Sequence, residues 1–117
     1  MAKILVVDDE IDILEIVEII LISNGFDVYT HTSGYNVPRI VTDYKPDIIL
    51  LDISLPYRSG TEICKELKET HDIPILLFSA RTKAEEAYKG CNADGFIGKP
   101  FDVKDLLNQI NKHLKTG

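Results

Sequence analysis

The carboxylate of Asp52 closes an apolar segment and is the first candidate for chemistry in this sequence. The four residues before it, 48–51, are Ile or Leu, and Pro56 and Gly60 follow in a loop-forming segment. A continuous apolar run of this length, bounded by turn residues, is typical of a strand that is buried on both faces of a parallel sheet. Ligands and reactions in such sheets gather where the strands end at their carboxyl edge. An isolated Asp is more often a turn residue, so the ends of the other apolar segments decide between the two roles.

Four further polar side chains end apolar segments in the same way. They are Asp8 and Asp9 after the first segment, Ser79 after the fourth and Lys99 after the fifth. Carboxylates that are brought close together repel one another unless a cation lies among them, and oxygen ligands favour a hard ion, usually Mg²⁺ where a phosphate is also bound. A carboxylate can act as the nucleophile that forms an aspartyl phosphate, and a lysine and a hydroxyl neutralise and hydrogen-bond a phosphoryl group. Together these residues predict Mg²⁺-assisted phosphoryl chemistry at Asp52.

Strand and helix patterns alternate along the whole chain. We expect strands at 3–8, 27–31, 47–52, 73–78 and 95–98. We expect helices at about 9–24, 38–44, 59–70 and 82–90, and a last helix that Asp102 caps. Alternation of this kind predicts a doubly wound α/β fold, with a five-stranded parallel sheet and helices on both faces. The segment 27–31 is less apolar than the other strands and suits a sheet edge.

The first helix is apolar on more than one side. A stripe at helical spacing is expected to face the core, and it consists of Ile13, Ile16, Val17, Ile20 and Leu21. A second set lies off this stripe, and it consists of Ile11, Leu14, Ile19 and Ile22. Single exposed apolar residues are ordinary, but the helix begins beside the first acidic segment end and also suits the docking of a partner's helices. The sequence leaves both interpretations open.

Composition excludes several classes of function. A length of 117 residues, 44% of them hydrophobic, predicts one domain, 1–117, with a real core. The formal net charge of −6 argues against binding of nucleic acid or of an anionic membrane surface. The most apolar stretch, 16–22, is too short to span a membrane, and no signal peptide is expected before the first strand. Cys64 and Cys91 lack metal-site spacing, which favours ordinary packing in a reduced, cytoplasmic compartment.

Four short motifs are spread along essentially the whole chain. They are the pair Asp8-Asp9, the segment LLDISLP with Gly60, the segment FSA, and the segment KPF with Phe96 three residues before its lysine. With these motifs the chain resembles the receiver domain of response regulators in two-component signalling. The resemblance implies a flavodoxin-like sheet with strand order 2-1-3-4-5. It also implies a phosphorylation-controlled switch that is not a conventional enzyme but catalyses its own phosphorylation and dephosphorylation.

The resemblance further implies a phosphoacceptor and a metal site. Asp52 would accept a phosphoryl group from a phosphohistidine of a sensor histidine kinase or a phosphotransfer protein. Asp8 and Asp9 would hold Mg²⁺, directly or through water, together with Asp52 and the backbone carbonyl of Ser54.

The remaining motif residues would act on the phosphoryl group. Lys99 would contact the phosphoryl oxygens, next to a cis bond to Pro100. Ser79 would swing towards the phosphoryl group, and Phe96 would move inward behind it. The change would control an output protein or an output domain outside this chain, and a phosphorylation-dependent dimer is one form that such control can take.

The chain departs from the family's pattern at Ser54, at Ser59, where an Asp is frequent, and at Asn92, where a Gly is usual. None of these departures removes a predicted site side chain. The first two lie close to Asp52 in sequence, and we expect them to influence how long the phosphoryl group survives.

Three other functions compete with a receiver. A hydrolase of the haloacid-dehalogenase type needs a second Asp two residues after the nucleophile, and Ser54 stands there. A nucleotide-binding enzyme needs a Gly-rich loop after the first strand, which is missing. A receiver-like module that works without phosphorylation needs none of the strand-end residues, so the intact set disfavours it.

Overall fold

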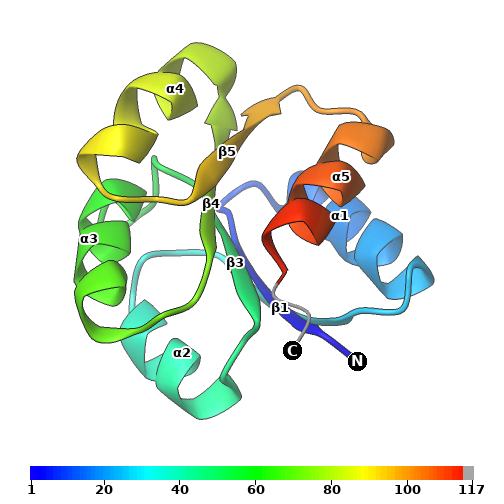
Figure 1. The fold of residues 1–117 in the computed structure, drawn as a ribbon, viewed down its shortest axis with the longest axis horizontal. Coiled ribbons are helices and arrows are strands. Elements are labelled where there is room, and N and C mark those ends of the chain that lie inside the picture. The colour runs from blue at the N-terminus through cyan, green and yellow to red at the C-terminus, as the bar shows by residue number, and fades with distance from the viewer. Residues whose placement is uncertain (115–117) are drawn as a thin grey trace.

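The fold is a five-stranded sheet between two layers of helices, and the computed structural model describes residues 1–114 (Figure 1). The strands are β1 (Lys3–Val7), β2 (Asp27–His31), β3 (Ile48–Leu51), β4 (Ile75–Ala80) and β5 (Gly95–Lys99). The helices are α1 (Ile11–Ser23), α2 (Val37–Tyr44), α3 (Gly60–Thr70), α4 (Arg81–Gly90) and α5 (Val103–His113). None of these helices has both the length and the apolar character that a membrane crossing requires.

All neighbouring strands pair in parallel, in the order β2-β1-β3-β4-β5. Both the predicted doubly wound fold and the predicted strand order are therefore confirmed. Helices α1 and α5 cover one face of the sheet, and α2, α3 and α4 cover the other (Figure 1). Strand β2 lies at the edge and is largely exposed or half-buried, as its weaker apolar pattern predicted.

Both faces of the central strands are buried. In β1, Leu5 and Val7 pack under α2, α3 and α4, whereas Ile4 and Val6 pack under α1 and α5. Every residue of such a strand contacts one helix layer or the other, so the strand is apolar throughout rather than at alternate positions. This double burial explains why unbroken apolar runs marked the central strands in the sequence.

The predicted core stripe of α1 was partly wrong. Ile16 is 50% exposed, whereas Leu14, which was placed off the stripe, is only 5% exposed. The buried residues are Leu14, Val17 and Leu21, at i, i+3 and i+7. A helix turns by 100° per residue, so Ile16 lies on the side opposite Leu14. Because α1 is apolar nearly all round, its sequence gave little information on which side faces the sheet.

The ends of the elements shift by one or two residues, most clearly in β4. The predicted strand 73–78 lies instead at Ile75–Ala80. Its last residues, Ser79 and Ala80, continue the ladder by pairing with Gly98 and Lys99 of β5. Ser79 and Lys99 therefore lie within the ends of two paired strands and are not loop residues beyond them.

Two helix starts follow their predicted caps. The Ser59 hydroxyl accepts a hydrogen bond from the Glu62 backbone N–H at 3.3 Å. The Asp102 carboxylate accepts one from the Asp105 N–H at 2.7 Å. Each cap satisfies a backbone donor that the first turn of a helix leaves without a partner. Ser59 thereby fixes where α3 begins, directly after the loop that follows Asp52.

Candidate functional site

The predicted site side chains gather at one edge of the sheet. Asp8 follows β1, Asp52 follows β3, Ser79 is the next-to-last residue of β4 and Lys99 is the last of β5. Asp8, Asp52 and Ser79 are 0%, 4% and 7% exposed, and among the side chains that the structure describes they are the buried polar ones. Burial of polar groups is unfavourable unless they are paired, so their concentration at one edge marks a functional site.

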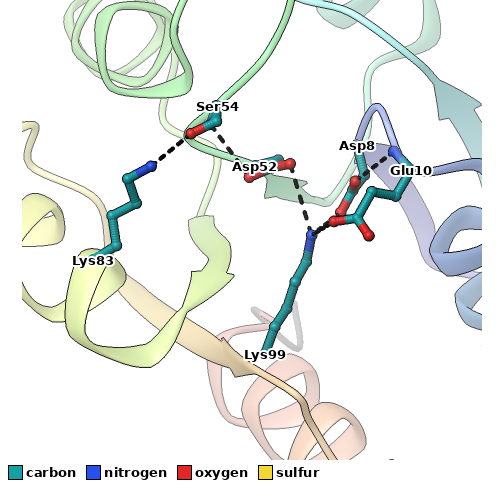
Figure 2. Close-up of polar contacts among 6 residues, drawn as sticks. All are labelled: Asp8, Glu10, Asp52, Ser54, Lys83 and Lys99. Carbon is teal, nitrogen blue, oxygen red and sulfur yellow. Dashed lines mark hydrogen bonds and ion pairs between the residues drawn. The ribbon is translucent and has the colours of Figure 1, made fainter.

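Lys99 joins the acidic groups of this edge (Figure 2). Its ammonium Nζ lies 2.5 Å from Asp8 Oδ2, 3.4 Å from Glu10 Oε1 and 3.7 Å from Asp52 Oδ2. The Lys99 side chain is itself only 16% exposed. The peptide bond from Lys99 to Pro100 is cis, as the resemblance implied. The cation that the crowded carboxylates require is thus supplied, within the described chain, by Lys99.

The same packing changes the proton affinity of the two central groups. Burial lowers the pKa of Lys99, but the hydrogen bond to Asp8 and the negative charges around it outweigh this, and the net result is a raised pKa. Burial raises the pKa of Asp52 from 3.8 to about 6, and the charge of Lys99 opposes that rise. At neutral pH Lys99 is therefore an ammonium and Asp52 a carboxylate that is poorly solvated.

A second feature of this edge is a group of oxygen ligands. The carboxylate oxygens of Asp8, Asp9 and Glu10 lie within 4.8 Å of one another, with Asp8 buried and the other two exposed. An all-oxygen, anionic donor set with one exposed side fits a hard cation such as Mg²⁺. The family resemblance implied Asp8, Asp9, Asp52 and the Ser54 carbonyl as ligands, but not Glu10, whose only signal was its place next to Asp9. Asp52 is linked to this group through Lys99, whose ammonium contacts both Asp8 and Asp52.

Comparison with known proteins identifies the family. The family model of the response regulator receiver domain matches residues 4–111. The chain belongs to the response regulator receiver domain family. It is similar to the chemotaxis response regulator CheY4 of Vibrio cholerae, with 29% identity, a TM-score of 0.89, and coverage of 97% of this chain and 99% of that one.

The chain is also similar to two further solved structures, which differ in how much of their own length it covers. One is NtrX from Brucella abortus, with 30% identity, a TM-score of 0.88, and coverage of 97% of this chain but only 27% of that one. The other is the BeF3-activated N-terminal receiver domain of RstA from Klebsiella pneumoniae, with 26% identity, a TM-score of 0.87, and coverage of 97% of this chain and 99% of that one.

Membership of the receiver family decides one of the competing hypotheses, namely whether the chain is a conventional enzyme. A receiver domain of a two-component response regulator is a module for phosphorylation-controlled signalling, and not a conventional enzyme. The hydrolase hypothesis is therefore wrong. The hypothesis of a receiver-like module that works without phosphorylation is not decided by family membership, and it needs an experiment.

Two switch residues predicted for the receiver differ in their surroundings. Ser79 is buried in β4 beside Gly98 of β5, at the same edge as Asp52. Phe96 is half-buried, and its ring packs against that of Tyr88 in α4, with 5.2 Å between the ring centroids. Phe96 therefore belongs to the contact between β5 and α4 and not to the acidic edge itself. The switch roles of both residues remain predictions.

A second residue that contacts the site, Lys83, was also missed. The ammonium of Lys83, in the first turn of α4, donates a hydrogen bond to the Ser54 hydroxyl at 2.8 Å (Figure 2). The Ser54 backbone N–H in turn donates to Asp52 Oδ1 at 3.3 Å. In the sequence, Lys83 is one of several charged residues of a polar helix, and only the packing of α4 beside β4 brings it to the site.

Proposed function

We propose that this receiver takes a phosphoryl group from a phosphohistidine of a sensor histidine kinase, or of a phosphotransfer protein, onto Asp52. The reaction depends on Mg²⁺, and the resulting change of conformation controls an output protein or output domain. One observation supports this function above others: buried Asp8 and Asp52 lie within 4 Å of the ammonium of Lys99, and buried Ser79 lies on the adjoining strand at the same edge of the sheet.

The transfer step follows from this arrangement. An oxygen of Asp52 attacks the phosphorus and forms a new O–P bond, while the bond from phosphorus to the donor breaks and its electron pair leaves with the donor group. Asp8 and Asp9, together with Asp52 and the carbonyl of Ser54, would hold the metal, and Glu10 lies close enough to Asp8 and Asp9 to join them. When bound, Mg²⁺ supplies positive charge to the non-bridging oxygens.

The switch is a shift between two populations of the domain. A change from mostly inactive to mostly active needs about 5.5 kcal/mol of differential stabilisation. In the unphosphorylated protein, Lys99 is bound to Asp8 and Glu10. We expect it to exchange these contacts for phosphoryl oxygens, and Ser79 to add a hydrogen bond, because charge-assisted hydrogen bonds of this kind are strong.

The kinase's helices have a candidate docking surface on α1. This helix begins beside the acidic edge and exposes Ile11, Ile16, Ile19 and Ile22 by 50% or more. An apolar helix face suits packing against the helices of a partner. We place the phosphotransfer reaction in the cytoplasm. Phosphorylation-dependent dimerisation of the receiver is one form that the control of the output can take.

The function is tested by incubating the protein with acetyl phosphate and Mg²⁺ and measuring its intact mass. We expect a gain of one phosphoryl group, mapped to Asp52, which does not appear when EDTA removes the metal. If no group is gained, the protein is a module that works without phosphorylation. If the group maps to another residue, Asp52 is not the acceptor.

A substitution of Ser79 by Ala separates acceptance from switching. We expect Ser79→Ala to label with acetyl phosphate at a rate within about threefold of the wild type, because Asp52, Lys99 and the acidic ligands stay in place. The backbone amide NMR changes that phosphorylation causes in α4 and β5 should be strongly reduced. Equal NMR changes in variant and wild type would remove Ser79 from the switch.

A further inference from the structure

Two lysine side chains lie on different sides of Asp52, and one of them, Lys83, contacts Ser54 instead of Asp52 itself (Figure 2). Lys99, from the end of β5, lies 3.7 Å from Oδ2. Lys83, from the start of α4, reaches Ser54, whose backbone N–H donates to Oδ1. One lysine ammonium therefore contacts the acceptor carboxylate directly, and the other is linked to it through Ser54.

The two lysines differ in what holds them. Lys99 is nearly buried and ion-paired with Asp8, Glu10 and Asp52. Lys83 is exposed, and its ammonium donates to the neutral hydroxyl of Ser54. A hydrogen bond from an ammonium to an anionic oxygen is roughly twice as strong as one between neutral groups. The hydrogen bond from Lys83 therefore becomes stronger when an anionic oxygen comes within reach of its ammonium, and among the described residues Lys83 forms no buried ion pair that would have to break first.

The charge of the site increases the need for a second cation. Phosphorylation replaces the single charge of a carboxylate by a phosphoryl group of about −2 at neutral pH. Asp8, Asp9 and Glu10 already place negative charge at this edge, and Lys99 is shared among several carboxylates. We propose that Lys83 is a second phosphoryl-binding cation of this receiver. On phosphorylation its ammonium passes from the Ser54 hydroxyl to a phosphoryl oxygen, so that the group is held between Lys83 and Lys99.

This proposal rests on Asp52 being the phosphoacceptor, and a simpler role for Lys83 must be distinguished from it. Lys83 could act only as a support that holds Ser54, whose carbonyl is a proposed metal ligand. A supporting role predicts that loss of Lys83 weakens binding of Mg²⁺ alone. A phosphoryl contact predicts that Mg²⁺ binding is kept and that binding of a phosphoryl-like anion is weakened.

The test substitutes Lys83 by Gln and uses Lys89→Gln as the matched control. Lys89 is exposed in the last turn of the same helix, so the control removes the same charge away from Asp52. A positive charge in the first turn opposes the helix dipole, so Lys83→Gln is expected to fold. Titration calorimetry measures the binding of Mg²⁺ alone and then of beryllofluoride, a phosphoryl mimic, in saturating Mg²⁺.

We expect Lys83→Gln to bind beryllofluoride about tenfold more weakly than the wild type, which is typical for loss of one charge-assisted hydrogen bond. Its Mg²⁺ affinity should stay within about twofold of the wild type, and Lys89→Gln should match the wild type in both titrations. Unchanged beryllofluoride binding in Lys83→Gln overturns the proposal, and so does a parallel loss of Mg²⁺ binding. Labelling of the wild type by acetyl phosphate is measured alongside. If the wild type labels at Asp52 and Lys83→Gln behaves as the wild type does, the inference fails while the proposed function stands.

Discussion

Substitution of Asp52 by Asn is expected to abolish labelling by acetyl phosphate and, at the same time, to make the folded protein more stable. Labelling should fall at least a hundredfold, because an amide oxygen is a far weaker nucleophile than a carboxylate. The gain in stability has an electrostatic cause. Burial among other acids raises the pKa of Asp52 to about 6, so the ionised form that is present at pH 7 is disfavoured in the folded protein.

The size of this gain depends on pH. The difference between a pKa of 3.8 and one of about 6 corresponds to at most about 3 kcal/mol at neutral pH. This value already includes the opposing charge of Lys99, but the amide of Asn must also be buried at a cost, so we expect Asp52→Asn to raise the free energy of unfolding by about 1–2 kcal/mol at pH 7. The folded state binds this proton more tightly than the unfolded state. The gain therefore shrinks as the pH falls from 6 towards 4, and it vanishes below the unfolded-state pKa.

Urea unfolding in EDTA at pH 7 and pH 4 measures this effect, and Asp43→Asn serves as the control. Asp43 lies on α2 in an exposed ion pair with Arg39, with 68% of its side chain exposed. Its substitution should leave labelling unchanged and stability within about 0.5 kcal/mol. A variant Asp52→Asn that is less stable than the wild type at pH 7 would show that the acceptor carboxylate stabilises the fold instead of opposing it.

The parts of this protein that the sequence predicted well are those that two-sided burial dictates. Residues 48–51 can satisfy both helix layers only as an unbroken apolar run, so the end of that run located Asp52. The side chains of Asp8, Ser79 and Lys99 were found by the same argument on neighbouring strands. The order of the strands came from the family resemblance, since the alternation of strands and helices alone leaves several orders open.

The parts that were missed depend on packing between distant elements. The side of α1 that faces the sheet was unclear because Leu14 and Ile16 are both apolar. The end of β4 depends on how far its ladder with β5 extends, which the segment 73–80 does not encode by itself. Lys83 reaches the site through a long side chain from a neighbouring helix. Such contacts leave no periodic signal in the sequence.

Substitution of Gly60 by Ala is expected to be among the most destabilising single-methyl additions in this domain. Gly60 is the buried first residue of α3, and its N–H donates to the Ile53 carbonyl at 2.8 Å. A Cβ atom at this position would lie 1.9 Å from the Asp52 carbonyl oxygen and 2.8 Å from its carbonyl carbon. Both are backbone atoms, so no side-chain rotation relieves the clash. We expect a loss of about 3 kcal/mol or more in the free energy of unfolding, at or above the upper end for overpacked sites.

Gly90→Ala is the matched control, because Gly90 is the last residue of α4 and a Cβ there meets nothing within 4 Å. Its stability should stay within about 0.5 kcal/mol of the wild type or rise slightly, since Ala restricts the unfolded chain more than Gly does. Urea unfolding of both variants measures the difference. In Gly60→Ala the clash can be relieved only by moving the start of α3 or the backbone of Asp52 itself. The fraction that still folds at low temperature should therefore also label more slowly with acetyl phosphate. A variant that is as stable as the wild type but labels slowly would place the strain in the acceptor segment, whereas wild-type values for both would show that α3 shifts freely and that Gly60 does not set the position of Asp52.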